Sequence, residues 1–231
     1  MDARNRSPGL PFASELSHLN GPERLRKEPR QERSRVLTHA IIEATLRVLQ
    51  REGIEYLTTV RVAEVAGVSI GSLYQYFPNK QALVAALIAR YLETLSHKVV
   101  EAARCASGSP YREGLQSVTT TFVRAKQDLA EVARALRPLM GQHSSQALAK
   151  ATRGRVHDSI ETLLARFPDL EVKDAKSTAQ VLIGAVEGAV AALIVDASPD
   201  APAEDVEQVV FDLARAFVES RAVQPVLPEH R

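Results

Sequence analysis

The sequence has little of what covalent cross-linking or metal binding would need. Cys105 is the only cysteine among 231 residues, and tryptophan is absent. An intrachain disulfide and a cysteine-based zinc site are therefore excluded. Six histidines are scattered without an H-x-x-x-H pair, and we interpret each as a surface or partly buried side chain. The sequence predicts neither a metal nor a cofactor, and a lone cysteine is compatible with the reducing cytoplasm.

Long apolar runs and strand patterns are also scarce. The most apolar stretch, residues 181–195, holds 15 residues with Glu187 in its middle. That is shorter than the roughly 20 apolar residues that a transmembrane helix needs. No apolar run follows the early arginines as it would in a signal peptide, and no stretch from Gln81 onward shows sustained alternation with a period of two. We expect an all-α protein without a membrane span.

Charge is balanced overall but unevenly distributed. The formal net charge is +1, yet ten Lys/Arg stand against six Glu between Arg24 and Lys80. From Gln81 onward, 17 Lys/Arg stand against 19 Asp/Glu. A basic first third is typical of a localised nucleic-acid surface. Residues 1–30 predict a disordered arm, whose basic end is either a solvated tail or a contact to phosphate or the minor groove.

One stretch of the N-terminal third has the pattern of two short helices joined by a tight turn. Thr58 or Thr59 can cap the first helix through its hydroxyl. Gly67 can supply the left-handed conformation that helix ends favour. Ser69 can cap the second helix, which we expect at about residues 70–77, before a proline stops it. This pattern is the signature of a helix-turn-helix.

The second of these helices carries the most informative side chains. Leu73 and Phe77 share one face and should pack inward. The outer face combines hydroxyls that can donate to phosphate, a glutamine that can pair with adenine and an isoleucine that can contact a thymine methyl. We predict phosphate contacts from Thr59, Tyr74, Tyr76 and Lys80, and base-edge contacts from Ile70, Gly71, Ser72 and Gln75. These roles rest partly on a resemblance described below.

Helical periodicity continues on both sides of this motif. A stripe of apolar residues at helical spacing predicts a supporting helix over about 31–51. Asn79 can cap a long connector helix that reaches about residue 106. Further helices are expected over about 111–126, 128–140, from Ser144 to about 167, and 203–221, with a loop over 141–145.

Residues 58–80 resemble the DNA-binding segment of the TetR/AcrR family of one-component bacterial transcriptional regulators. The family pattern is roughly T-T-x-x-x-I-A-x-x-A-G-V-S-x-G-x-L-Y-x-Y-F-x-x-K, and the resemblance covers about residues 33–93. Val60 departs from it, because some members carry a base-reading basic residue there. The matching positions are Ala63, Ala66, Gly67, Val68, Ser69, Gly71, Leu73, Tyr74, Tyr76, Phe77 and Lys80.

The resemblance implies an architecture and a function. It implies a dimeric repressor whose recognition helices enter the major groove of a palindromic operator, and which a small-molecule effector releases. The implied domains are a helix-turn-helix domain at 31–80, extending to about 93, and a helical effector-binding and dimerisation domain at 81–222. Residues 223–231 would form a loose tail.

The resemblance also places an effector pocket between the connector helix and the helices at 111–167. Without metal clusters or concentrated charge, the sequence favours a mostly apolar effector. Each pocket candidate can equally be plain core, the default place for apolar side chains. The candidate lining residues are Tyr111, Phe122, Met140, His143 and Phe167.

A row of small residues predicts the dimer contact. Gly184 and Gly188 lie one helical turn apart, so this helix can either be an ordinary buried helix or pack closely on its two-fold mate. In TetR-like proteins the last two long helices form the interface, and C2 is the commonest symmetry of oligomers. The predicted interface residues are Gly184, Ala185, Gly188, Ala192, Val210 and Phe217.

Two other classes of function remain open from the sequence. One is a DNA-binding regulator without a small-molecule effector, controlled by a protein partner or acting as an activator. The other is an α-helical enzyme. Residues 67–71 fit G-x-S-x-G, the nucleophile elbow of α/β-hydrolases, but that motif needs a strand before the serine, and the preceding segment has helical periodicity.

Overall fold

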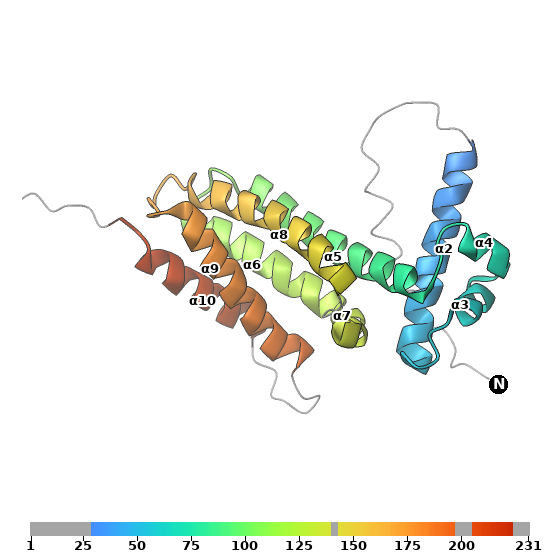
Figure 1. Ribbon diagram of the computed structural model, residues 1–231. Helices are drawn as coiled ribbons and strands as arrows, with labels where there is room; N and C mark the ends of the chain where they lie inside the picture. Colours follow the sequence, from blue (N-terminus) through green and yellow to red (C-terminus); the bar gives the residue numbers. More distant parts are fainter. Residues whose placement is uncertain (1–28, 140–142, 197–204, 224–231) are drawn as a thin grey trace, which may run out of the picture.

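The computed structural model describes residues 29–139, 143–196 and 205–223, which are almost entirely helical (Figure 1). This confirms the all-α prediction. Within the described residues, the sole β contact is an isolated bridge between Val172 and Ala222. The elements are α2 (Pro29–Glu52), α3 (Thr59–Ala66), α4 (Ile70–Tyr74), α5 (Lys80–Cys105), α6 (Tyr111–Asp128), α7 (Ala130–Leu136), the 3-10 turn η2 (Arg137–Leu139), α8 (His143–Leu164), α9 (Ala175–Val190), the π-helical turn η3 (Ala191–Val195) and α10 (Val206–Ser220).

Side-chain caps fix the boundaries of the helix-turn-helix. The Thr58 hydroxyl accepts from the amide of Arg61 at 3.1 Å, and the Ser69 hydroxyl accepts from the amide of Ser72 at 3.0 Å. Gly67 closes α3 with φ of +69°, a conformation that glycine adopts without steric cost. Asn79 caps α5 by accepting from the amide of Ala82. The polar residues at these positions therefore decide where each helix begins.

Two apolar cores organise the molecule. The first joins α2, α3 and α4 to the N-terminal half of α5 and also to α7. The second joins the C-terminal half of α5 to α6, α8, α9 and α10. Figure 1 shows α5 running from the head, formed by α2, α3 and α4, into the helices of the second core. One long helix therefore belongs to both cores.

Several predicted boundaries are wrong. Helix α4 ends at Tyr74 instead of 77, because the amides of Tyr76 and Phe77 both donate to the carbonyl of Leu73 in a tighter turn. The residue before Pro78 is also biased away from the helical region. Ser144 does not start a helix, since α8 already includes His143. The segment predicted as one helix at 128–140 begins instead as the end of α6, followed by α7 and a 3-10 turn at Pro138.

The apolar stretch near the C-terminus is longer in the structure than in the sequence interpretation. Helix α9 and η3 form a continuous 21-residue run, Ala175–Val195, which by length and composition alone could cross a membrane. In this fold α9 packs against α8 and α10. A third of its most apolar window is buried. The helix therefore leaves an apolar face outside the protomer.

Most of the two predicted terminal segments lies outside the described residues. Helix α2 begins at Pro29, so its first two residues fall within the arm predicted for 1–30. Of the tail predicted for 223–231, only Val223 is described.

Candidate DNA interface and effector cavity

Helix α4 has one buried face and one exposed face. Leu73 is fully buried and Phe77 is nearly so, and both belong to the first core. On the opposite side Tyr74 and Ile70 are 49% and 38% exposed. Gly71 and Gln75 are exposed as well, and Ser72 is half-buried. The structure thus presents three predicted contact residues on the outer surface of α4 and a fourth, Gln75, at its C-cap.

Two predicted phosphate contacts meet between α3 and α4. The hydroxyl oxygens of Thr59 and Tyr74 lie 3.1 Å apart, within hydrogen-bonding distance. Each hydroxyl can donate one hydrogen and accept others. One hydroxyl can therefore donate to the other, and the hydroxyl that accepts keeps its own hydrogen for a phosphate oxygen.

Lys80 and Tyr76 are less exposed than the α4 surface. The Lys80 ammonium donates to the carbonyl of Ile54 at 2.9 Å. An ammonium carries three hydrogens, so this bond leaves donors for a phosphate. Tyr76 is half-buried and packs against the first core. Both residues support the helix-turn-helix in addition to any contact they make with DNA.

Arg61 is a feature that sequence reasoning did not single out. Its guanidinium donates to both carboxylate oxygens of Glu52, with Nε to Oε2 at 3.0 Å, and to Glu64 at 3.0 Å. The hydrogen bond from Arg61 lowers the pKa of the Glu52 carboxyl. The i, i+3 spacing to Glu64 was the available signal. Two carboxylates thus offset the charge of Arg61, while the adjacent Val60 is 55% exposed.

The hydrolase alternative fails on local geometry. Ser69 follows a left-handed glycine after helix α3, where the nucleophile elbow requires a strand. Its hydroxyl caps α4 and lies 2.8 Å from the hydroxyl of Ser72. Ser69 therefore acts as a helix cap.

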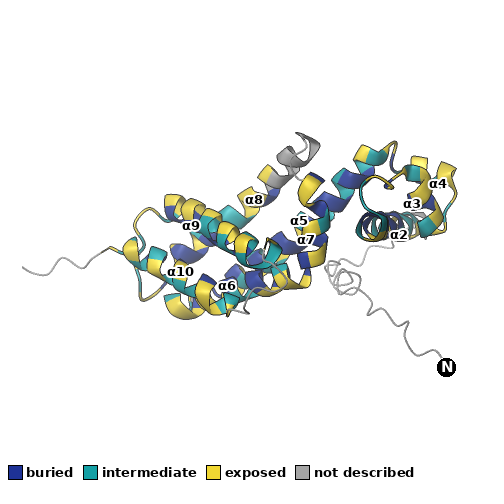
Figure 2. Ribbon diagram, turned by 90° about the horizontal axis from the view of Figure 1, so that it is seen from below, coloured by how far each residue is buried: buried dark blue, intermediate teal, exposed yellow. Residues whose placement is uncertain are grey.

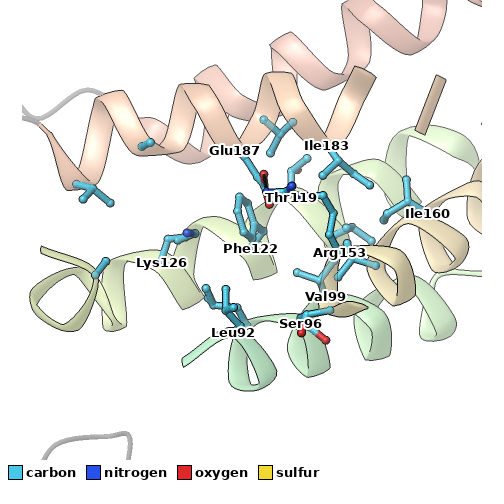
Figure 3. A pocket seen from close by; sticks show the side chains of 18 of the residues that line it. Leu92, Ser96, Val99, Thr119, Phe122, Lys126, Arg153, Ile160, Ile183 and Glu187 are labelled. Carbon is cyan, nitrogen blue, oxygen red and sulfur yellow. Dashed lines mark ion pairs between the residues drawn. The ribbon is translucent and has the colours of Figure 1, made fainter. Parts of the chain in front are cut away.

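A cavity of about 400 Å³ opens between the helices of the second core and α7. This volume falls within the range of small-molecule sites, roughly 300–1,000 Å³. Figure 3 shows the α6 residues Phe122 and Lys126 side by side, across from Leu92 and Ser96 of α5. The apolar lining residues are Leu92, Leu95, Val99, Leu115, Val118, Phe122, Ala133, Leu136, Val156, Ile160, Leu163, Leu182, Ile183, Val186, Ala191 and Val195.

Polar and charged groups occupy limited parts of the cavity wall. Arg153 of α8 faces Glu187 of α9 at 3.7 Å, and Arg137 pairs with Asp196. The cavity is also lined by the π-helical turn η3, through Ala191 and Val195. Such turns within α-helices are frequent at functional sites. The other polar lining residues are Tyr91, Ser96, Thr119, Lys126 and Thr152.

The structure brings one of the five predicted pocket residues to this cavity. Phe122 lines it. Tyr111 and Phe167 instead pack edge-to-face on one another in the second core, with ring centroids 6.3 Å apart. The Tyr111 hydroxyl donates to Glu219, and that bond raises the pKa of the Tyr111 phenol. Met140 and the side chain of His143 lie outside the described residues.

The predicted dimer residues fall into two groups. Gly184, Gly188 and Ala192 are exposed, and Ala185 is half-buried. Val210 is fully buried in the second core, so its prediction as an interface residue is wrong: Val210 lies on the inner face of α10. Phe217 is half-buried against the same core. The large apolar side chains that face outward on α9 and α10 are Val181, Val209 and Leu213, at 54%, 42% and 38% exposure, and none of them is among the six predicted interface residues.

One titratable cluster was not expected from the sequence. His157, Asp158 and Glu161 of α8 place their ligand atoms within 4.8 Å of one another. The imidazole Nδ1 lies 3.9 Å from Asp158 and 3.8 Å from Glu161. His157 and Glu161 lie four positions apart on one helix, a spacing at which side chains are neighbours, and Asp158 is adjacent in sequence, so local helix geometry explains this grouping.

These features define a class of protein. A capped helix-turn-helix with an exposed second helix, joined by one long helix to an all-α body, is the architecture of a DNA-binding regulator. Residues 41–87 match the model of a protein family, the bacterial regulatory proteins of the tetR family.

Individual relatives are similar to part of the chain. The repressor KstR of Mycolicibacterium smegmatis is 39% identical over 72 residues, which cover 31% of this chain and 35% of KstR. The nucleoid occlusion factor SlmA of Haemophilus ducreyi is 42% identical over 57 residues, covering 24% of this chain and 28% of SlmA. The chain thus spans about a third of the length of these curated relatives.

The likeness in fold extends further than the likeness in sequence. A crystal structure from Mesorhizobium loti, assigned to the TetR family, superposes with a TM-score of 0.67. The match is at 16% identity and covers 83% of this chain and 99% of that chain. Residues 41–87 therefore match the tetR family, as the resemblance of residues 58–80 predicted, and the chain shares its fold with a solved structure assigned to that family.

Proposed function

We propose that this chain is a dimeric, cytoplasmic repressor that binds a palindromic operator and is released from it by a small, mostly apolar effector. The cavity of about 400 Å³, walled mainly by aliphatic side chains, is the observation that carries the effector. This cavity also favours a ligand-controlled regulator over one controlled only by a protein partner, and over an α-helical enzyme.

The exposed face of α4 supports the proposed mode of DNA binding. We place α4 in the major groove, with Ile70, Gly71, Ser72 and Gln75 toward base edges. Tyr74 and Thr59 approach phosphates as a hydroxyl pair, 3.1 Å apart. Lys80 adds its remaining donors beside the carbonyl of Ile54, and Tyr76 completes the phosphate contacts. In a two-fold dimer these heads would occupy half-sites one or more helical turns apart.

The outer faces of α9 and α10 support the proposed dimer. Figure 2 shows exposed stretches along both helices. Small residues, namely Gly184 and Gly188 on α9 and Ala192 on η3, leave room for close approach of a second helix. Val209 and Leu213 of α10 supply apolar area beside them. We propose that these two helices and their mates form a four-helix interface.

Helix α7 supports a route from the effector to the head. Ala133 and Leu136 line the cavity and also belong to the first core, which contains the helix-turn-helix. Helix α7 contacts α2 directly. A ligand that displaces α7 would therefore disturb the packing of the head, and it would favour dimers whose heads no longer match the half-site spacing.

A pair of cavity variants tests this route. Leu136→Ala and Leu163→Ala each remove a buried leucine side chain from the cavity wall, at a cost of about 2–5 kcal/mol. Leu163 lies in the second core, away from the head. Effector should lower operator affinity by some factor in wild type. We expect this factor to be smaller in Leu136→Ala and unchanged in Leu163→Ala. Equal loss of that ratio in both variants would refute a route through α7.

The function itself is tested by operator binding. Purified protein is titrated onto DNA from its own upstream region over a salt series, with random DNA as competitor. We expect tight binding that resists competitor and weakens steeply as salt rises. Tyr74→Ala should abolish the preference for upstream DNA over random DNA. It should leave the fold intact, because this side chain is half exposed. Binding no tighter than to random DNA would refute the simple repressor.

A further inference from the structure

We propose that the cavity selects an amphipathic effector with a single anionic group, and that this group binds beside Lys126. The inference rests on the proposed function, because it specifies the chemistry of the effector. It comes from the charges that face the cavity and from the two aromatic residues around one of them.

The cavity wall carries three cations and two carboxylates. Arg153 is paired with Glu187, and Arg137 is paired with Asp196. Among the residues that the structure describes, no carboxylate pairs with Lys126. The wall therefore has one positive charge in excess, and that charge lies on α6 at the cavity surface (Figure 3).

The surroundings of Lys126 suit an anion. Its ammonium donates to the Tyr91 hydroxyl at 3.1 Å and lies 5.5 Å from the ring centroids of both Tyr91 and Phe122. Aromatic faces stabilise a cation, but they leave the ammonium hydrogens incompletely satisfied. Because the Tyr91 oxygen accepts from Lys126, its own hydrogen is available to a ligand. An anion at this point would thus accept from both side chains.

The rest of the wall restricts what is attached to the anion. Beyond Lys126 the surface is mostly aliphatic, with Leu92, Leu95 and Val186 among its members. A lysine ammonium is a compact point charge and lacks the planar fork of an arginine. One unpaired lysine in such a wall matches one carboxylate, or one similar monoanion, on an apolar body.

The test uses decanoate and decan-1-ol as matched probes in titration calorimetry with the full chain. Decanoate should bind wild type about ten- to a hundredfold more tightly than Lys126→Met, the range for a hydrogen bond to a charged group. Decan-1-ol should bind both proteins equally. Lys176→Met removes one exposed positive charge from α9 and should match wild type for both probes. Decyl sulfate distinguishes a carboxylate preference from a general preference for monoanions.

A second variant separates the two donors. Tyr91→Phe keeps the ring beneath Lys126 and removes only the hydroxyl, so it should weaken decanoate binding by less than Lys126→Met does. Thermal unfolding confirms that each variant is folded. Equal affinity of decanoate for wild type and Lys126→Met would overturn the anion site while leaving the apolar cavity standing. If neither probe binds and neither alters operator affinity, the proposed effector cavity fails, and the anion site fails with it.

Discussion

Replacing Gly184 by leucine gives the sharpest test of the proposed dimer, because its effects on the fold and on the interface have opposite signs. Within the protomer, a Cβ added at Gly184 meets no atom within 4 Å. Glycine in a helix interior costs about 1 kcal/mol relative to good helix formers. We therefore expect Gly184→Leu to leave the isolated protomer as stable as wild type or slightly more stable.

At a close helix–helix contact the same side chain would be an obstacle. Overpacking typically costs about 1–3 kcal/mol for each inserted side chain. In a C2 dimer the change occurs twice. The expected loss is therefore about 2–6 kcal/mol, so the dimer dissociation constant should rise about thirtyfold or more. Operator affinity should fall in parallel, because two heads no longer bind together.

Sedimentation over a concentration series measures the dissociation constant directly. The control is Gly154→Leu in α8, another exposed helical glycine whose added Cβ meets no atom within 4 Å. It should leave the dimer unchanged. If Gly184→Leu is as dimeric as Gly154→Leu, the assignment of the interface to α9 is wrong.

Three further predictions concern the head and the second core. Tyr74→Phe retains the exposed ring and loses the hydroxyl beside Thr59, so operator affinity should fall about fivefold while its dependence on salt stays unchanged. Lys80→Met should instead lower the slope of log affinity against log salt concentration by about one. Equal slopes for the two variants would exclude a phosphate contact by Lys80. Burial, and after it the charge of Arg90, lower the pKa of the His39 imidazole below 6.5, and Glu43 opposes them. Protonation of His39 is therefore less favourable in the folded than in the unfolded state, so the protein loses stability as pH falls through the pKa that His39 has in the unfolded chain. Urea unfolding between about pH 7.5 and 5.5 should therefore show a larger loss in wild type than in His39→Gln, and parallel curves would contradict this. Gly114→Ala places a Cβ 2.9 Å from Phe167 Cε1 and should lower the melting temperature, whereas Gly154→Ala, in open space, should not; a melting temperature unchanged by Gly114→Ala would show that the Phe167 ring moves at little cost.

The local part of the fold could be predicted from the sequence because it depends on neighbours in the chain. Thr58, Gly67, Ser69 and Asn79 act within three or four residues of themselves, and each caps or closes a helix where its chemistry predicts. The early end of α4 was missed, since it depends on two amides sharing the carbonyl of Leu73. Such a competition between turn geometries leaves no mark in apolar periodicity.

The cavity could not be predicted in the same way, because its wall is assembled from five separate parts of the chain. Tyr111, Phe122 and Phe167 are aromatic residues of similar apolar character, yet only Phe122 reaches the cavity. The other two are held together by an edge-to-face contact and by the bond from Tyr111 to Glu219, 108 residues away. Which face of a helix becomes cavity wall is decided by partners of this kind.

The same reasoning explains why the sequence pointed to α5 alone as the connection between effector and DNA. A long amphipathic helix is visible from its periodicity, and α5 does cross both cores. Helix α7 has only seven residues, and nothing in its pattern shows that Ala133 and Leu136 pack with the head. Its position follows from the turn at Leu129, a residue buried in the first core, after which α7 contacts α2. If effector binding moves the head, this short helix is the element whose packing changes at both ends, and α5 supplies the rigid support against which it moves.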